Sequence, residues 1–488
     1  MANYSEKILL INPTTFFISD YYKDLYYHSI PNQLLQLSSF LFSKLSLSTE
    51  IIDLRFENEL EPILTSKNLD KVLFRKKIIK ILETYNTQEY SIVAILNEST
   101  NNYLQVKILS EMIKSHFPNQ IVVVGGHHAK VKPYDYLDKK YPIDLIITGE
   151  LENCFHDLLK NDKLHHIKKQ QETKILDSRR TTKLDLLPFP DFARYLEKYP
   201  YKNHFTFELN MSKGCPFSCK FCRIINYDKK IRNFSLEPFL MRFKRLTKFA
   251  KNFTSIPKIS FSDQTFNSSA LSRKVLNYII DHKMNEEIQF SCQTRIEMVD
   301  MNRKLLNLFK KANMVVGYGL ESADKQLLLE MNKTSQPSKY IAKMKKIIQK
   351  YKEINEIYCR VNIICGFPGE NPMSFQRTVN FIEKNAQHDN IQINPTLFSN
   401  DPATHVYKSM PTYQKKFGTK FIKEWWKKPL DPMKSSVLPK PSKNYYLSEL
   451  LENYLEKYSR ILRFFKKSSF PTLIHWSKYF KSWLEKVS

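Results

Sequence analysis

Three cysteines in the middle of the chain are the residues whose type and spacing most clearly predict chemistry. Cys215, Cys219 and Cys222 follow the pattern C-x3-C-x2-C. Thiolates this close in sequence converge on one soft cation or on a metal cluster. They come directly after an alternating stretch at 205–211, which predicts a strand.

The number of available ligands separates two kinds of metal site. A structural zinc site is closed by four ligands, but the nearest histidines on the two sides are His204 and His282. An iron–sulfur cluster can be held by three thiolates, with one iron left for a substrate or cofactor. The spacing therefore favours a cluster. A zinc knuckle and a chance grouping of core cysteines are the alternatives.

A three-cysteine loop at the end of a strand resembles the signature of the radical S-adenosylmethionine (SAM) enzymes. In that family the cysteines hold a [4Fe–4S] cluster, and SAM chelates the open iron through its amino and carboxylate groups. An electron from the cluster then splits SAM into methionine and a 5′-deoxyadenosyl radical. The resemblance implies that Cys215, Cys219 and Cys222 are metal ligands. It also implies an electron donor such as flavodoxin or ferredoxin.

The totals indicate a multidomain protein of a reducing compartment. A chain of 488 residues is long enough for about two to three domains. Seven cysteines, three of them grouped, are typical of a reducing compartment rather than of a disulfide scaffold. The sequence shows no signal-peptide core and no stretch of about 18 apolar residues. A cytoplasmic protein is therefore expected.

The net charge of +27 has two explanations. A polyanionic partner, such as RNA or an anionic membrane surface, would suit it. A composition rich in lysine and poor in glycine would also produce it, and the lysines are spread along the whole chain. The second explanation is favoured, so nucleic acid or a membrane surface is an alternative partner rather than the expected one.

Residues 1–165 are predicted to form a doubly wound parallel sheet. Short apolar runs alternate with helical periodicity, and four of these runs end in polar or glycine-containing turns. Ligands bind beyond the carboxyl ends of such strands. The candidate cofactor-binding residues at these ends are Asn12, Thr100, Gly125, Gly126, His127, Gly149 and Glu150.

This segment resembles the cobalamin-binding domain that precedes many radical SAM domains. The matching motifs are Leu10-Ile-Asn-Pro13, Val124-Gly-Gly-His127 and Thr148-Gly-Glu-Leu-Glu152. The resemblance implies cobalamin as a second cofactor. The D-x-H-x-x-G motif, whose histidine binds cobalt from below, is absent, so that ligand is not expected. His127 as a solvated turn residue and Glu150 at a helix start are the alternatives to cofactor contacts.

Three further segments complete the predicted α/β architecture. Residues 166–200 are polar and carry Pro188 and Pro190, which predict an extended linker. Residues 201–400 alternate strand and helix again and resemble the partial (β/α)6 barrel of the radical SAM domain. Residues 401–488 mix basic and aromatic side chains, including Trp425-Trp426, and predict a helical C-terminal region that caps the barrel.

Polar residues and glycines follow the strands of the predicted barrel. The family resemblance places SAM or substrate at Asp263 and a polar SAM contact at Arg295. It implies further SAM contacts at a G-x-G-x-E-S element and a G-x-P-G-E turn, whose residues are Gly317, Gly319, Glu321, Ser322 and Gly366. Asp263 and Glu321 are the candidate catalytic residues, with a helix cap or an ion pair as the alternative for each.

The resemblance implies a SAM-cleaving, cobalamin-using enzyme that methylates an unactivated carbon of a small molecule or peptide. A radical SAM cyclase, desaturase or rearrangement enzyme would share the architecture without methyl transfer. A tRNA methylthiotransferase is disfavoured, because that group usually has three more cysteines and residues 1–200 contain only Cys154. A basic RNA-binding protein with a structural metal is the alternative from another class.

Overall fold

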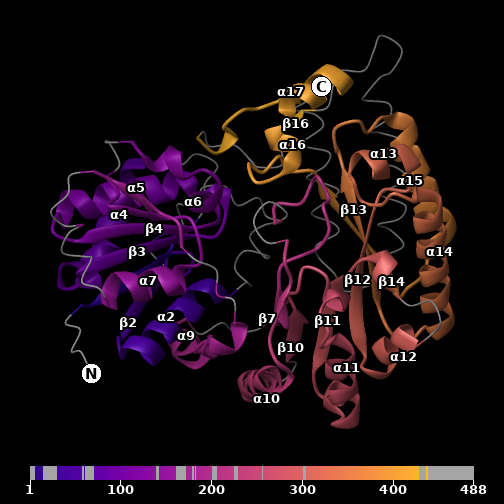
Figure 1. Cartoon of the computed structure of the whole chain (residues 1–488), viewed down its shortest axis with the longest axis horizontal. Coiled ribbons are helices and arrows are strands. Elements are labelled where there is room, and N and C mark those ends of the chain that lie inside the picture. Colours follow the sequence, from indigo (N-terminus) through magenta and orange to yellow (C-terminus); the bar gives the residue numbers. More distant parts are fainter. Residues whose placement is uncertain are drawn as a thin grey trace. The chain divides into compact units, whose positions relative to one another are not determined.

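The computed structural model divides into two units (Figure 1). Unit 1 comprises Met1–His204 with Glu424–Pro432, and unit 2 comprises Phe205–Lys423 with Met433–Ser488. The structure describes residues 6–14, 30–57, 60, 71–138, 142–160, 167, 172–178, 181, 183–199, 206–224, 229–254, 257–299, 304–427 and 436–437. No helix within these ranges is long and apolar enough to cross a membrane.

Unit 1 contains a six-stranded sheet whose strands are all parallel, in the order β2-β1-β3-β4-β5-β6. The strands are β1 Ile8–Asn12, β2 Thr49–Asp53, β3 Ile92–Asn97, β4 Ile121–Gly126, β5 Leu145–Ile147 and β6 Lys174–Leu176. The order reverses beside β1, as it does in a doubly wound fold. The predicted Rossmann-like sheet is therefore confirmed, and β6 extends it beyond the predicted domain end.

The described helices that connect the strands of unit 1 are α2 Asn32–Leu45, α4 Lys71–Thr84, α5 Tyr103–His116, α6 His127–Val131 and α7 Leu151–Lys160. The apolar run that forms β1 is fully buried, as expected for a central parallel strand covered on both faces. Helix α2 buries Leu34, Leu37 and Leu41, which share one face of the helix. The spacing of the apolar residues thus determines which segments form strands and which form helices.

The segment predicted as an extended linker contains a short helix, α9 Phe192–Lys198. Its start follows Pro190, and the Asp191 side chain caps it by accepting a hydrogen bond from the Arg194 amide. Tyr195 donates a hydrogen bond of 2.7 Å to the buried carboxylate of Asp53 at the end of β2. This segment therefore packs on unit 1, where Tyr195 joins Arg55 and Asn12 as a donor to the buried Asp53 carboxylate.

Residues 424–427 also belong to unit 1, although the sequence places them far downstream. Trp425 is 1% exposed and Trp426 is 2% exposed. The Trp426 indole N–H donates to Asp135 at 2.7 Å, and its ring lies 5.4 Å from that of His128. These tryptophans are core residues of unit 1, and not part of the basic cap that the sequence predicted.

Unit 2 contains a second six-stranded parallel sheet, in the order β14-β13-β12-β11-β10-β7. The strands are β7 Thr206–Leu209, β10 Lys258–Phe261, β11 Gln289–Thr294, β12 Met314–Glu321, β13 Cys359–Cys365 and β14 Ile391–Leu397. Neighbours in sequence are neighbours in space, and β7 and β14 form the two edges. This is the topology of the predicted partial barrel.

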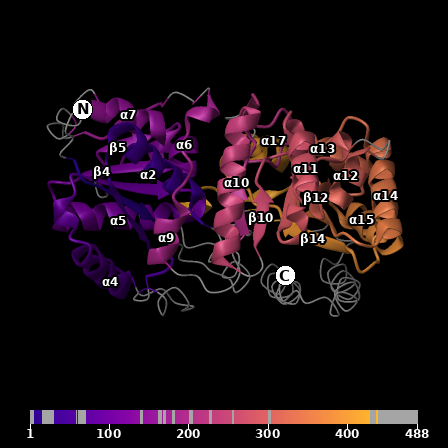
Figure 2. The same cartoon turned by 90° about the horizontal axis from the view of Figure 1, so that it is seen from below.

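The helices of unit 2 cover one face of its sheet (Figure 2). They are α10 Leu236–Phe253, α11 Ser272–Asp281, α12 Lys304–Lys311, α13 Lys325–Glu330, α14 Pro337–Ile354 and α15 Pro372–Asn385. Phe243 of α10 packs on Phe261 and Phe290 of the sheet, with ring centroids 5.8 Å apart in both pairs. Alternate residues point to the opposite face, which is predominantly polar on β11, β13 and β14.

Two short helices follow β14, α16 His405–Lys408 and α17 Met410–Phe417. Val406 and Tyr413 pack with Phe367 and Phe398 in a small apolar core. Strand β15 Lys420–Phe421 then pairs with β16 Ser436–Val437. The start of the predicted C-terminal region is therefore helical, and residues 438–488 of that region lie outside the described residues.

We expect Trp426→Ala to destabilise unit 1, because the substitution removes a buried ring and leaves Asp135 without its indole donor. Truncation of a buried tryptophan lowers the free energy of unfolding by about 3–5 kcal/mol. Urea denaturation followed by circular dichroism measures this loss. Tyr134→Ala is the matched control, since Tyr134 neighbours Asp135 but is 76% exposed. Equal stability of the two variants would contradict the burial of Trp426.

Candidate active site

The cysteine loop is anchored at its start by Asp263. This residue follows β10, is 3% exposed, and accepts hydrogen bonds through both carboxylate oxygens. The donors are the Met211 amide at 3.0 Å, the Ser212 amide at 2.7 Å and the Ser212 hydroxyl at 2.5 Å. Burial raises the pKa of Asp263 to about 6, although these hydrogen bonds favour the carboxylate. In this structure Asp263 positions the loop.

The three cysteines differ in exposure. Cys219 is buried, whereas Cys215 and Cys222 are half-buried. The Cys222 amide donates to the Cys219 carbonyl at 3.0 Å, which tightens the loop between them. The Cys215 sulfur lies 3.9 Å from the Thr265 hydroxyl. No three His, Cys, Asp or Glu side chains in the described chain are arranged to hold a single metal ion.

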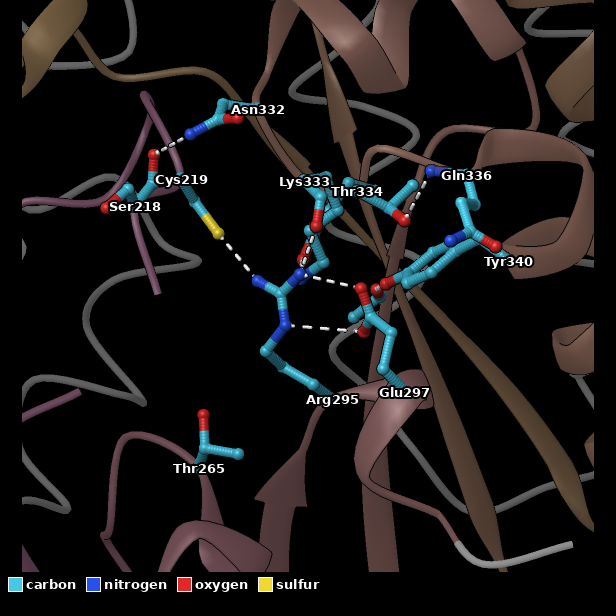
Figure 3. A network of polar contacts seen from close by, with 12 residues as sticks. Ser218, Cys219, Thr265, Arg295, Glu297, Asn332, Lys333, Thr334, Gln336 and Tyr340 are labelled. Atoms are coloured by element: carbon cyan, nitrogen blue, oxygen red, sulfur yellow. Dashed lines mark hydrogen bonds and ion pairs between the residues drawn. The ribbon is translucent and has the colours of Figure 1, made fainter. Parts of the chain in front are cut away.

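Arg295, which follows β11, makes a direct polar contact to a cysteine sulfur (Figure 3). Its Nη1 donates to Cys219 Sγ at 2.8 Å, and its Nη2 donates to Glu297 at 2.9 Å. The guanidinium is also stacked 4.0 Å above the Phe217 ring. Burial alone would lower the pKa of Arg295, but the Cys219 sulfur and the Glu297 carboxylate raise it above its ordinary value.

The turn between α13 and α14 holds the cysteine loop from the other side. Asn332 Nδ2 donates to the Ser218 carbonyl at 2.8 Å, as Figure 3 shows. The Lys220 amide donates to the Met331 carbonyl at 2.9 Å. Arg295 Nη2 also donates to the Lys333 carbonyl. The turn and the cysteine loop therefore form one hydrogen-bonded assembly.

Lys333 of this turn forms a buried ion pair with Glu321. The two side chains are 6% and 9% exposed, and Lys333 Nζ lies 2.8 Å from Glu321 Oε1. Although burial alone would lower it, the pKa of Lys333 is raised by the nearby Glu321 carboxylate. Gly319 makes room for the pair, because a Cβ there would lie 2.3 Å from Glu321 Oε1 and 2.7 Å from Lys333 Nζ.

The other predicted SAM-contact residues of unit 2 lie in different environments. The Ser322 hydroxyl accepts a hydrogen bond from the Asp324 amide at 3.0 Å, so it supports the turn into α13. A Cβ at Gly317 would lie 3.3 Å from Gln293, whereas one at Gly366 would meet nothing within 4 Å. Gly366 has a φ of +78°, and its amide donates to the Glu370 carboxylate. Burial raises the pKa of Glu370 to about 8.

Sequence analysis identified part of this assembly. Arg295, Gly319 and Glu321 were predicted as SAM contacts, and the structure brings them together at the cysteine loop. Asn332 and Lys333 were missed, because nothing in their local sequence indicates that the α13–α14 turn reaches the cysteines. In the sequence, the one indication of a role for Lys333 was that it lies shortly after the motif that contains Glu321.

The predicted cofactor residues of unit 1 lie at the carboxyl ends of its strands or in the turns that follow them, as expected. Asn12 donates to Asp53 at 3.0 Å, and the Thr100 hydroxyl lies 3.3 Å from His128 Nδ1. Glu150 accepts a hydrogen bond from the Thr181 amide at 2.6 Å. These contacts are made within unit 1, so the cobalamin contacts stay a prediction.

The glycines of unit 1 are explained by close internal packing. A Cβ at Gly125 would lie 2.4 Å from Leu151, and one at Gly149 would lie 2.3 Å from the Ser178 carbonyl oxygen. Gly126 combines a φ of +99° with a close approach to the Asn97 backbone. His127, which follows Gly126, is half-buried at the start of α6. Gly126 and Gly149 meet backbone atoms and are therefore required by the fold whether or not a ligand binds, whereas Gly125 faces the side chain of Leu151.

Comparison with known proteins identifies a domain and a fold. Residues 209–382 match the Radical SAM superfamily. An uncharacterized methyltransferase from Pyrococcus horikoshii is 24% identical over 327 residues, which are 63% of this chain and 66% of that protein. The ribosomal protein uS12 methylthiotransferase RimO of Chlamydia pneumoniae is 22% identical over 329 residues, 62% of this chain and 67% of that protein.

Among solved structures, the cobalamin-dependent SAM radical enzyme OxsB, with aqua-cobalamin and SAM bound, aligns with a TM-score of 0.65. The sequence identity is 17%, and the alignment covers 99% of this chain and 71% of OxsB. This similarity confirms the predicted fold. The Radical SAM match contains all three cysteines, Asp263, Arg295 and Glu321. The chain spans about two thirds of the length of the two sequence relatives.

Gly319→Ala is expected to separate the buried pair of Glu321 and Lys333. Both atoms in the way are side-chain ends that can move, but their movement leaves two buried charges apart. We expect overpacking to lower the free energy of unfolding by about 1–3 kcal/mol, measured by thermal or urea denaturation. Gly317→Ala on the same strand is the control, because its Cβ meets only ordinary to tight contacts. A larger effect at Gly317 would contradict this assignment.

Arg295→Gln is expected to make the reduction potential of the reconstituted cluster more negative. The cation and its N–H···S bond to Cys219 stabilise the added electron, and a neutral amide does so less. Potentiometric titration followed by electron paramagnetic resonance measures the change. Arg377→Gln removes an equal charge from an arginine paired with Asp324, and serves as control. An unchanged potential at equal cluster content would refute this role of Arg295.

Proposed function

We propose, from the premise that this chain carries a radical SAM domain at residues 209–382, that it is a cobalamin-using radical SAM methyltransferase. Its substrate would be a small molecule or peptide with an unactivated carbon as the methylation site. The observation that carries the proposal is the three-cysteine loop, hydrogen-bonded to Arg295 and fixed by Asp263 at the carboxyl ends of the barrel strands. Functional groups of parallel barrels lie at these ends.

The residues present fit a [4Fe–4S] cluster. Cys215, Cys219 and Cys222 would hold it, and three thiolates leave one iron open for SAM. When bound, the cluster supplies the electron that cleaves SAM, and cobalamin supplies a methyl carrier. An electron donor such as flavodoxin or ferredoxin would be needed. The half-buried state of Cys215 and Cys222 supports access to the loop from solvent.

The surrounding side chains fix the position of the cysteine loop. Asp263 fixes its first residues and Arg295 orients Cys219, so these residues position the ligands. Glu321 is a candidate for SAM contact, and its carboxylate is paired with Lys333 in a buried setting. Gly317, Ser322 and Gly366 remain predicted SAM contacts. Gly366 has the most open surroundings of these three, which supports contact with a bulky group.

Cobalamin would bind at the carboxyl ends of the unit 1 strands. The six-stranded parallel sheet and the likeness to OxsB support this site. The chain has no D-x-H-x-x-G motif, so a histidine of that motif would not hold the cobalt from below. Asn12, Thr100, Gly125, Gly126, His127, Gly149 and Glu150 are the candidate contacts.

Methylthiotransfer is the alternative that the RimO relative suggests. The additional cysteines expected for that activity are not found in unit 1 of this chain. Residues 1–200 contain only Cys154, which is 7% exposed in α7. A cyclase, desaturase or rearrangement activity would use the same domain without methyl transfer. The match to the radical SAM family favours all of these over an RNA-binding protein with a structural metal.

Anaerobic reconstitution with iron, sulfide and hydroxocobalamin tests the proposal directly. We expect absorption bands of both cofactors after gel filtration. Incubation with SAM and a reductant should then give methionine and 5′-deoxyadenosine without any substrate. With substrate, a methyltransferase should also form S-adenosylhomocysteine, whereas a cyclase or desaturase should not.

Cys219→Ala is expected to abolish SAM cleavage and to leave cobalamin binding intact, since the two sites belong to different units. Cys292→Ala is the matched control, because Cys292 is a buried cysteine outside the loop. It should retain the cluster. A wild-type protein that takes up no iron would overturn the whole proposal. One that takes up iron but no cobalamin would overturn the methyltransferase version.

A further inference from the structure

One arginine on the polar face of the unit 2 sheet is not explained by the fold. Arg360 is the second residue of β13, and Cys359 and Val361 beside it are fully buried on the opposite face. Arg360 is half-buried among polar side chains. Its Nε donates to Gln392 Oε1 at 2.9 Å. The guanidinium therefore lies on the side of the sheet away from the helices.

Among the residues that the structure describes, the charge of Arg360 has no counter-charge. Within the described ranges, its hydrogen-bond acceptor is the neutral Gln392 amide, and no carboxylate lies at ion-pair distance. Burial lowers the pKa of Arg360, and no nearby acid offsets this effect. The other buried arginines differ, since Arg55 is paired with Asp53 and Arg295 with Glu297. A desolvated guanidinium is unfavourable unless an anion completes it.

The neighbours of Arg360 are suited to a polar ligand. In the strand register, Gln293 lies opposite Gly317, Gly317 opposite Arg360, and Arg360 opposite Gln392. The next row places Gly319 opposite Asn362 and Asn362 opposite Asn394. Gly317 therefore leaves the β12 position beside Arg360 without a side chain, whereas the ion pair of Glu321 and Lys333 occupies the space over Gly319. Amide groups on β11, β13 and β14 lie around Gly317 and offer both donors and acceptors.

We propose that Arg360 binds a carboxylate or phosphate group of the substrate, with Gln293 and Asn362 as further contacts. This inference rests on the proposed function, because it assumes that the substrate binds on the polar face of the barrel sheet. It names the substrate class as an anionic organic molecule. The net charge of +27 would assist the approach of such a molecule.

The position of Arg360 indicates where the anionic group lies on the substrate. Arg295 contacts Cys219. The residue before Arg295 pairs with Tyr318, so Arg295 lies two residues closer to the carboxyl ends of the strands than Arg360 does. Two residues along a strand span about 7 Å, and two strand spacings span about 10 Å. The anionic group is therefore on the order of 10 Å from the cysteine loop. SAM has its carboxylate on the cluster in this family, so it does not supply this group.

Ligand-detected NMR on the reconstituted full chain tests the proposal. Benzoate and phenyl phosphate are the anionic probes, and benzamide is the neutral probe of the same shape. We expect saturable binding of one or both anions to the wild type and weaker or no binding of benzamide. Arg360→Gln should weaken anion binding about tenfold, as for the loss of a charge-assisted hydrogen bond. Arg360→Lys should give an intermediate affinity because it keeps the charge.

Arg377→Gln is the control and should bind the probes as the wild type does, because Arg377 already has the carboxylate of Asp324. Saturating SAM should leave the bound anion in place. Displacement of the probe by SAM would overturn the proposal, because Arg360 would then serve the SAM carboxylate. Equal anion binding by wild type and Arg360→Gln would also overturn it, as would absence of saturable binding to the wild type.

The same sample separates this inference from the proposed function. SAM cleavage by the wild type, measured as 5′-deoxyadenosine, reports on the proposed function alone. Anion binding that depends on Arg360 in a protein without SAM cleavage would support an anion site and refute the enzyme. A lower melting temperature of Arg360→Gln with unchanged anion binding would show that Arg360 serves the fold. Arg360→Lys keeps the test decisive if Arg360→Gln does not fold.

Discussion

The hydrogen bond from Arg295 to Cys219 is the contact on which the rest of the site depends. A guanidinium that is 7% exposed must direct each of its N–H groups to an acceptor. Here the acceptors are the Cys219 sulfur, the Glu297 carboxylate and the Lys333 carbonyl. Because the guanidinium is planar and rigid, these three acceptors fix one another's directions. The cysteine loop thereby takes its orientation from the end of β11.

This constraint extends to the ion pair above Gly319. Arg295 donates a hydrogen bond to the Lys333 carbonyl and so fixes the Lys333 backbone. From this position the Lys333 side chain pairs with Glu321. Glu321 adopts a φ of +64°, a conformation that is unfavourable for a residue with a side chain. The strand register also shifts between Gly319 and Glu321. A strained backbone is maintained where the surrounding contacts determine it, and the buried ion pair is such a contact.

The elements could largely be predicted from the sequence, because their apolar periods are local. The strands from β1 to β14 that line the two parallel sheets follow from short apolar runs, with β6 as the exception. Lys174–Leu176 is too short and too polar in its flanks to give a signal. The helix α9 was hidden by the prolines before it. Trp425 and Trp426 were misassigned because Asp135, the hydrogen-bond partner of Trp426, is almost three hundred residues away.

The candidate site was only partly predictable for the same reason. The cysteines, Arg295 and Glu321 lie in motifs at strand ends, where the fold itself brings residues together. Lys333 and Asn332 reach the loop through a turn whose direction depends on the packing of α13 and α14. Arg360 has no motif at all. Arg360 was inferred to bind a ligand because no carboxylate lies among its described neighbours, and only a three-dimensional structure can reveal this.

Glycines and unpaired charges therefore differ as guides to a binding site in this chain. Gly125, Gly126 and Gly149 would each place a Cβ against the protein's own atoms, so the fold alone accounts for them. A half-buried charge such as that of Arg360 is different, because burial makes it less favourable and its partner among the described residues is the neutral Gln392 amide. An anionic ligand that binds such a charge would supply the missing counter-charge. In the proposal made above, Arg360 marks the face of the barrel sheet between β12 and β14 as the site of substrate binding.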